Sequence, residues 1–153
     1  MRKSIEYLIE DGPDKGKIFI ITRMSAFEAD EWAADVIQAL TKAGTKLHPS
    51  REQFGIAGLE NLSIGIFANL EKEDRKKAYQ DLLNCCQIKR DPKNPLVQPT
   101  KILEVDIEDP KTLYRLRTKA FELHMDFIKA AACQVFHLAA AMFQTEGSNE
   151  ERK

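Results

Sequence analysis

The sequence has no excess of charge of either sign and no apolar run long enough to cross a bilayer. Its 23 Lys and Arg residues are balanced by 24 Asp and Glu residues, which gives a formal net charge of -1 in a chain of 153 residues. A basic surface is what draws proteins onto phosphate backbones, so we expect no nucleic-acid partner. The most apolar stretch, residues 130–143, falls short of the roughly 20 residues that a membrane span needs. We therefore expect no membrane partner.

The N-terminal stretch lacks the apolar core of a signal peptide, and the chain has few cysteines. The sequence MRKSIEYLIEDGPDKG is too polar for a secretory leader. Three cysteines, two of them adjacent at Cys85 and Cys86, cannot form the disulfide framework of a small secreted protein. These features favour a cytoplasmic protein with reduced thiols.

Motifs for catalysis, cofactor binding and metal binding are also missing. The sequence contains no Gly-rich phosphate loop and no nucleophile elbow. His48, His124 and His137 lack the spacing of a metal-binding pair, and the adjacent Cys85 and Cys86 would chelate one ion poorly. Structural or solvent-facing side chains are a better interpretation than a zinc site. We expect no enzyme, no cofactor and no metal.

The composition that remains is that of a globular protein. Hydrophobic residues make up 43% of the chain and charged residues 31%, which is ordinary for a folded domain. A chain of this length is sufficient for one domain with a modest core. We expect a single mainly helical domain with an N-terminal β-hairpin over residues 1–144 and a disordered tail over residues 145–153.

Alternating polar and apolar residues near the N-terminus predict the hairpin. Ile5, Tyr7 and Ile9 alternate with polar neighbours, and the segment KIFIIT is rich in residues that favour strands. The intervening EDGPDKG supplies the Gly and Pro of a longer turn. We expect strands over 4–10 and 17–23, in a hairpin that is either a structural flap or a docking element for a partner.

The segment SAFEADEWAADVIQALTKAG is the clearest helix pattern in the chain. Ser25 and Glu28 form a capping box at its start, and Gly44 is placed to end it. The pattern predicts a helix over 25–43, with Trp32 buried against the C-terminal helix. The apolar residues on its one face are Ala29, Trp32, Ala33, Val36, Ile37 and Leu40.

The middle of the chain has a weaker pattern. Residues 45–61, interrupted by Pro and Gly, predict a loop and a short helix. We expect a helix over 72–86, followed by the proline-containing segment 88–99 as a connection or an edge strand. Residues 101–105 are compatible with a further strand beside the hairpin.

A long C-terminal helix is predicted over 109–143. Asp109 caps it and Pro110 occupies its first position, where the missing amide costs nothing. A straight helix of this length would extend about 50 Å, more than a one-core domain needs, so it should bend or project. The predicted fold is thus mainly α (α+β): several helices, a small N-terminal antiparallel β-hairpin or sheet, and this long helix.

The apolar residues of the C-terminal helix form two stripes, and a helix with two apolar sides needs two partners. We expect Phe136, Met142 and Phe143 to form part of a partner-binding surface, used for self-association into a homo-oligomer or for a helix of another protein. The alternative is that both stripes lie inside one compact core.

Two stretches of the chain share a pattern with a known family. The first contains Gly-Lys, an extended segment ending in Thr-x-Met, and a helix with Ala-x-x-Trp-Ala; the second has an acidic, Ile-containing start followed by Leu-Arg and Leu-His. Together they resemble the tail assembly chaperones of long-tailed, siphovirus-like bacteriophages and prophages, over roughly residues 12–128. Ser25 stands where many of those proteins carry proline. The matching residues are Gly16, Lys17, Thr22, Met24, Ala29, Trp32, Ala33, Asp106, Ile107, Leu116, Arg117, Leu123 and His124.

The resemblance implies a binding protein without catalytic activity. Such chaperones bind the tape measure protein, keep it soluble and recruit tail tube subunits in the host bacterial cytoplasm during virion morphogenesis. They are absent from the mature virion. The alternative is a structural virion protein, such as a tail completion or head–tail connector protein, which persists in the finished particle.

Overall fold

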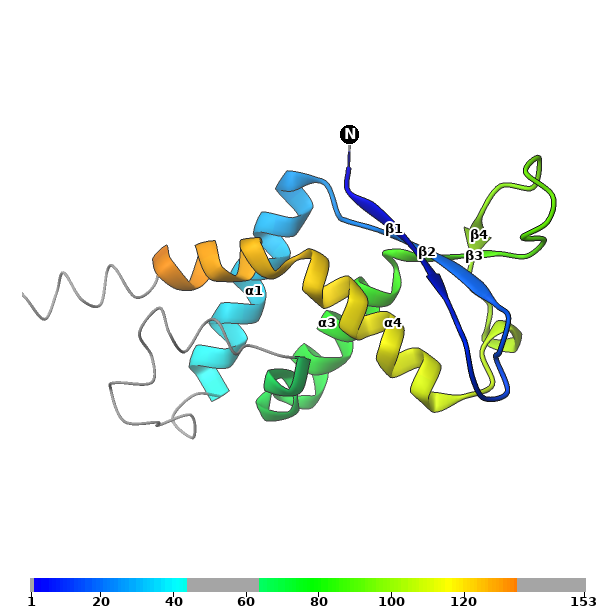
Figure 1. The fold of residues 1–153 in the computed structure, drawn as a ribbon. Coiled ribbons are helices and arrows are strands. Elements are labelled where there is room, and N and C mark those ends of the chain that lie inside the picture. Colours follow the sequence, from blue (N-terminus) through cyan, green and yellow to red (C-terminus); the bar gives the residue numbers. More distant parts are fainter. Residues whose placement is uncertain (1, 44–63, 135–153) are drawn as a thin grey trace, which may run out of the picture.

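The protein has a mixed α+β fold in which helices pack against a four-stranded antiparallel sheet (Figure 1). A computed structural model describes residues 2–43 and 64–134. The helices cover the face of the sheet that carries Phe19, Ile21 and Ile88, all of which are buried. Glu6 and Gln87 on the opposite face are exposed. The sheet is therefore one-sided, as the alternating pattern of the first strands predicts.

The sheet consists of β1 (Ser4–Leu8), β2 (Ile18–Thr22), β3 (Cys86–Lys89) and β4 (Thr100–Lys101), in that spatial order. β1 and β2 form the predicted hairpin, with Tyr7 opposite Phe19. The prediction of this hairpin is confirmed, although both strands are shorter than expected. In its turn, Gly12 and Gly16 have φ angles of 80° and 90°, which a residue with a Cβ atom adopts only with strain.

Helix α1 (Ala26–Ala43) confirms the clearest helix prediction. The Ser25 hydroxyl accepts a hydrogen bond from the main-chain N–H of Glu28 at 3.2 Å, which caps the first turn as the sequence predicts. The apolar face is buried over Ala29, Trp32, Ala33, Val36 and Ile37. Trp32 is only 4% exposed, so the prediction of its burial is also confirmed.

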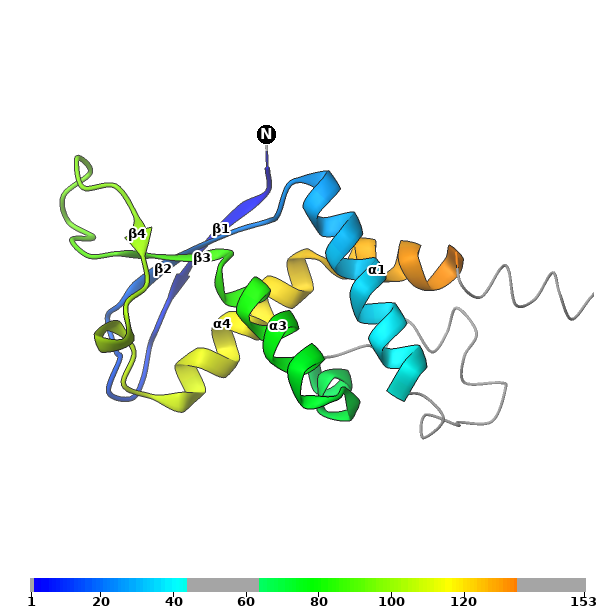
Figure 2. The ribbon, with the colours of Figure 1, turned by 180° about the vertical axis from the view of Figure 1, so that it is seen from behind.

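A short 3-10 helix, η3 (Ile64–Asn69), precedes α3 (Lys72–Leu83). Seen from behind, α3 lies between α1 and α4, and it contacts both (Figure 2). The predicted helix over 72–86 is wrong at its end, because Cys86 belongs to β3. β3 pairs with β2, which is distant in the sequence. The local helical periodicity cannot reveal such a distant strand partner.

The segment after β3 contains little regular structure. β4 has two residues, so the strand expected as compatible with residues 101–105 ends at Lys101, and η4 (Glu104–Asp106) is a 3-10 turn. Pairing stops at Lys101, opposite Gln87. The chain then turns toward the start of the C-terminal helix, so the sheet gains only a short edge strand.

Helix α4 (Pro110–Leu123) begins as predicted. A side-chain oxygen of Asp109 accepts a hydrogen bond from the N–H of Lys111 at 3.0 Å, and Pro110 is the first helical residue. The prediction of one unbroken helix is wrong at His124, where the helix is interrupted before residues 125–134 become helical again. The expected continuation over residues 135–143 lies outside the described residues. So does the predicted tail over 145–153.

The core lies where the helices meet the inner face of the sheet. Phe67, Phe121 and Trp32 are buried there, and the Phe67 ring packs edge-on against the other two. Within residues 2–43 and 64–134, no helix has the length and apolar character required to cross a bilayer.

Candidate functional site

The partner-binding residues predicted from sequence, Phe136, Met142 and Phe143, lie outside the described residues. The candidate site therefore lies within residues 2–43 and 64–134. Two features stand out: the internal contacts made by the residues that carry the family resemblance, and a charged cleft between α1 and α3.

The first internal contact joins the end of β2 to the C-terminal end of α4. The main-chain N–H of Met24 donates a hydrogen bond to Nε2 of His124 at 2.9 Å. Because Nε2 is the acceptor, the proton of the neutral ring is on Nδ1, which donates to the carbonyl of Ala120 at 2.7 Å. The Trp32 ring lies against His124, with ring centroids 5.5 Å apart. His124 is fully buried, so this contact is part of the core.

The same contact explains the interruption of the C-terminal helix. In a continuous α-helix, the N–H of His124 would donate to the carbonyl of Ala120. Here that N–H donates to the carbonyl of Phe121 at 2.9 Å, and the imidazole takes the Ala120 carbonyl instead. Burial lowers the pKa of His124 below its usual value, despite the hydrogen bond to Ala120, which acts in the opposite direction. The ring is therefore neutral at physiological pH.

The second internal contact joins the hairpin turn to the N-terminal end of α4. Asp14 is fully buried, and its carboxylate accepts hydrogen bonds from the main-chain N–H groups of Glu108 and Asp109, each at 3.0 Å. Lys17 Nζ donates both to Asp14 at 2.9 Å and to the carbonyl of Asp106 at 2.7 Å. The Asp14 charge thus lies at a helix N-terminus, where it is favoured electrostatically.

The electrostatics of this contact favour an ionised Asp14. Burial alone would raise the pKa of Asp14, but the hydrogen bonds from Lys17, Asp109 and Glu108 outweigh it and hold the pKa well below its usual value. The turn is therefore fixed to α4 within the chain. This arrangement supports the structural interpretation of the hairpin over the docking one.

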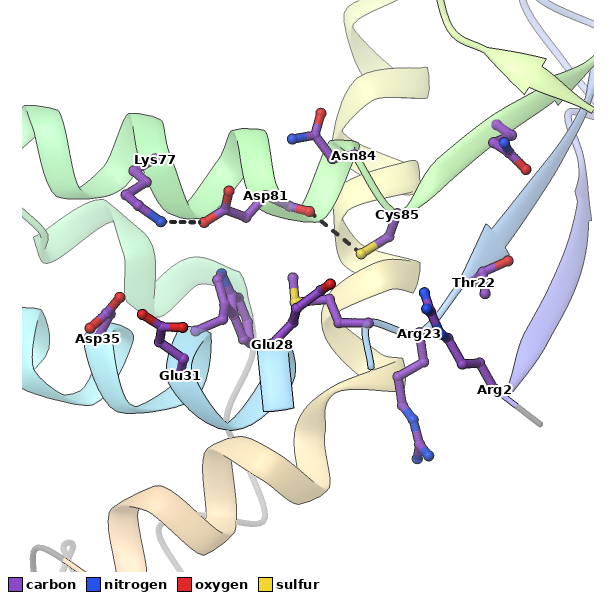
Figure 3. Close-up of a pocket in the computed structure, with 13 residues that line it drawn as sticks. Arg2, Thr22, Arg23, Glu28, Glu31, Asp35, Lys77, Asp81, Asn84 and Cys85 are labelled. Carbon is purple, nitrogen blue, oxygen red and sulfur yellow. Dashed lines mark hydrogen bonds and ion pairs between the residues drawn. The ribbon is translucent and has the colours of Figure 1, made fainter. Parts of the chain in front are cut away.

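A cleft of about 610 Å3 lies between α1 and α3 and opens toward the end of β2 (Figure 3). Glu28, Glu31 and Asp35 recur along one side of α1 and line one wall. In Figure 3, Lys77 and Asp81 of α3 face them from the opposite wall.

The two ends of the cleft differ in charge. Lys77 Nζ pairs with Asp81 at 2.7 Å, so the cation of the α3 wall already has a partner. Glu28, Glu31 and Asp35 are exposed, and their side chains make no hydrogen bond or ion pair within the described part of the chain. Arg2 and Arg23 lie at the other end, beside the last residue of β2 (Figure 3). The wall formed by α1 is thus acidic and available.

The floor of the cleft includes Trp32 and Cys85. The Trp32 indole Nε1 is buried and has no hydrogen-bond partner. Cys85 Sγ donates to the carbonyl of Asp81 at 3.4 Å, and burial raises the pKa of this thiol to about 11. Burial raises the pKa of the neighbouring Cys86 thiol to about 12. Both thiols are therefore protonated at neutral pH and poor nucleophiles.

Metal-binding side chains are not gathered anywhere in the described ranges. Across residues 2–43 and 64–134, no three His, Cys, Asp or Glu side chains are grouped so that they could hold a metal ion. Cys85 lies in the floor of the cleft, whereas His124 is engaged in the contact with Met24.

Sequence reasoning did not identify this cleft. The sequence identifies Glu28 only as a capping residue and gives no prediction for Glu31 and Asp35. Their recurrence along α1 is visible in the sequence, but the facing Lys77 and Asp81 come from a helix placed there by tertiary packing. No known family model, no curated protein and no solved structure matches this chain.

Proposed function

We propose that this protein is a tail assembly chaperone of a long-tailed bacteriophage or prophage. In this role it binds the tape measure protein in the host bacterial cytoplasm, keeps it soluble and recruits tail tube subunits. It acts through binding rather than catalysis, and it leaves before the virion is complete.

The observation that carries the proposal is the position of the residues that match the pattern of the tail assembly chaperones. Met24 and Trp32 of the first stretch contact His124 of the second. At the other end of the same interface, Lys17 of the first stretch bonds to the carbonyl of Asp106 in the second. The two stretches thus form one packing unit, held at both ends.

This arrangement supports the resemblance in a specific way. Two short patterns that matched a family by chance would have no reason to meet in space, whereas the determinants of a shared fold should pack together. Ala29, Ala33 and Leu116, which also carry the resemblance, are fully buried. The resembling residues therefore support the architecture, and the partner surface is expected elsewhere.

Phe136, Met142 and Phe143 belong to this proposal as part of a surface for the tape measure protein or for self-association. The competing function is a structural virion protein, such as a tail completion or head–tail connector protein. The two differ in where the protein is found once assembly ends.

Mass spectrometry of particles purified from an induced lysate separates the two functions. The chaperone proposal predicts that this protein is abundant in the lysate and absent from washed virions that contain the tube and tape measure proteins. A fixed stoichiometry in washed virions would contradict the proposal and favour the structural alternative. A known virion protein measured in the same sample is the internal control.

A further inference from the structure

We propose that the cleft between α1 and α3 is a docking site for a helical polypeptide segment that presents lysine or arginine side chains. The occupant inserts its cationic side chains along the acidic wall formed by Glu28, Glu31 and Asp35. The inference rests on the proposed function only in choosing a protein segment as the occupant.

The first support is a set of carboxylates without a close ion-pair partner: Glu31 and Asp35 attract Lys77 across the cleft, but neither is paired with it. Glu28, Glu31 and Asp35 are spaced so that they fall on one side of a helix, and all three line the cleft. Lys77, the cation on the facing wall, is already bound to Asp81 at 2.7 Å. Cationic groups entering the cleft would supply the partners that these exposed carboxylates lack in the described chain.

The second support is the unpartnered donor in the floor. Trp32 is only 4% exposed. It lines both this cleft and a smaller hollow farther along the same groove. Its Nε1 has no hydrogen-bond partner. A buried donor without an acceptor is unfavourable, and an oxygen of an incoming segment that displaced the atoms covering Nε1 would satisfy it. The floor thus offers a donor while the α1 wall offers acceptors, which suits a polypeptide better than a lone cation.

The third support is an exposed aromatic residue on α1, outside the lining of the cleft. Phe27 lies one helical turn before Glu31 on α1, and it is 91% exposed. Residues with this spacing are neighbours on a helix surface, and exposed aromatics beside polar clefts are typical anchors of protein interfaces. An amphipathic helix would place its apolar side on Phe27 and its cationic side along the acidic wall.

The test uses Trp32 as a built-in reporter, because it is the only tryptophan in the chain. The full-length protein, labelled with 15N, is titrated with an alanine-based helical peptide that carries lysines on one side and leucines beside them. The matched peptide has glutamine in place of every lysine. The measured quantity is the shift of the single indole N–H resonance at low ionic strength, where exposed charge pairs are least screened.

The proposal predicts that the lysine peptide shifts this resonance and the glutamine peptide does not. The double variant Glu31→Gln/Asp35→Asn should bind the lysine peptide roughly fivefold to tenfold more weakly, as expected for the loss of two exposed ion pairs. Asp30→Asn is the control, because Asp30 is exposed on the same helix but does not line the cleft. Phe27→Ser, at a fully accessible position, should keep the fold and weaken binding.

Three results would overturn the proposal: no indole shift with the lysine peptide, equal binding by the double variant and by Asp30→Asn, or an indole shift that depends on protein concentration without peptide. The last would identify a second copy of the chain as the occupant. None of these results bears on the tail-assembly function, because no tail protein is present in the titration. Conversely, peptide binding would survive a failure of the proposed function.

Discussion

The main-chain N–H of Met24 donates a hydrogen bond to Nε2 of His124, 2.9 Å away and 100 residues later in the sequence. This bond fixes the tautomer of a fully buried imidazole, interrupts the C-terminal helix and fastens the start of α1 to the end of α4. The contact makes stability dependent on the protonation of one side chain.

Replacing His124 with Leu should lower the free energy of unfolding at neutral pH by about 1–3 kcal/mol, because the N–H of Met24 loses its acceptor. Chemical denaturation measures the change.

Burial depresses the pKa of His124 in the folded state. Its contribution to the free energy of unfolding is therefore complete above the unfolded pKa of about 6.5 and is lost as the pH falls below that value. The His124→Leu variant should lack this loss of stability between neutral and mildly acidic pH. If the variant keeps the pH dependence of the parent protein, another group is responsible.

Replacing Asp14 with Ala should cost roughly 1.5–3 kcal/mol of unfolding free energy, because the charge-assisted hydrogen bonds that its buried carboxylate accepts from the main-chain amides of Glu108 and Asp109 are removed. Asp11→Ala is the matched control in the same turn, since Asp11 pairs with Arg115 at the surface and its side chain is 66% exposed; it should change stability little. The folded pKa of Asp14 is depressed, so its stabilising effect is complete above about pH 3.9 and is lost below it. Equal destabilisation by the two variants in urea denaturation would contradict the assignment.

Replacing Trp32 with Ala should lower the free energy of unfolding by about 3–5 kcal/mol, as expected for a large aromatic side chain in a core. Its ring packs against both Phe67 and His124. Trp32→Phe should lose much less, because it retains an aromatic ring at the same position. Thermal or urea denaturation measures both variants. An Ala variant that melts like the parent would show that the indole contributes to a partner surface rather than to the core.

Changing Phe136, Met142 and Phe143 together to polar residues tests the partner surface predicted from sequence. If these residues form that surface, the melting temperature stays unchanged while oligomers, or the solubility of a co-expressed tape measure protein, are lost. Outright unfolding would instead place them in the core and end this part of the proposal. Differential scanning calorimetry and size-exclusion chromatography provide the two readouts.

The sequence predicted the elements whose determinants are local. Ser25 is followed by an apolar face at helical spacing, and Asp109 precedes Pro110; both patterns mark helix starts that the structure has. The alternation near the N-terminus likewise predicted a hairpin whose two strands are joined by one short turn. In each case the stabilising partners lie within a few residues or across one tight connection.

The elements that the sequence missed depend on distant partners. Cys86 continues an apolar helical face in the sequence but pairs with Ile21 in the sheet. The helix break falls at His124, whose side chain bonds to the distant Met24, and the cleft requires α1 and α3 to face each other. Helical periodicity records none of these relationships, because it describes one element at a time.

The most direct test of the central claim is co-expression with the tape measure protein that the proposed function requires as a partner, a long helical protein, followed by measurement of how much of that protein stays soluble. The account predicts that the long protein precipitates alone, remains soluble with this chain, and elutes with it as a complex on size-exclusion chromatography. An unrelated small α+β protein expressed at the same level is the control and should not rescue solubility. If the long protein is equally soluble in all cases and no complex forms, the tail assembly chaperone assignment is contradicted.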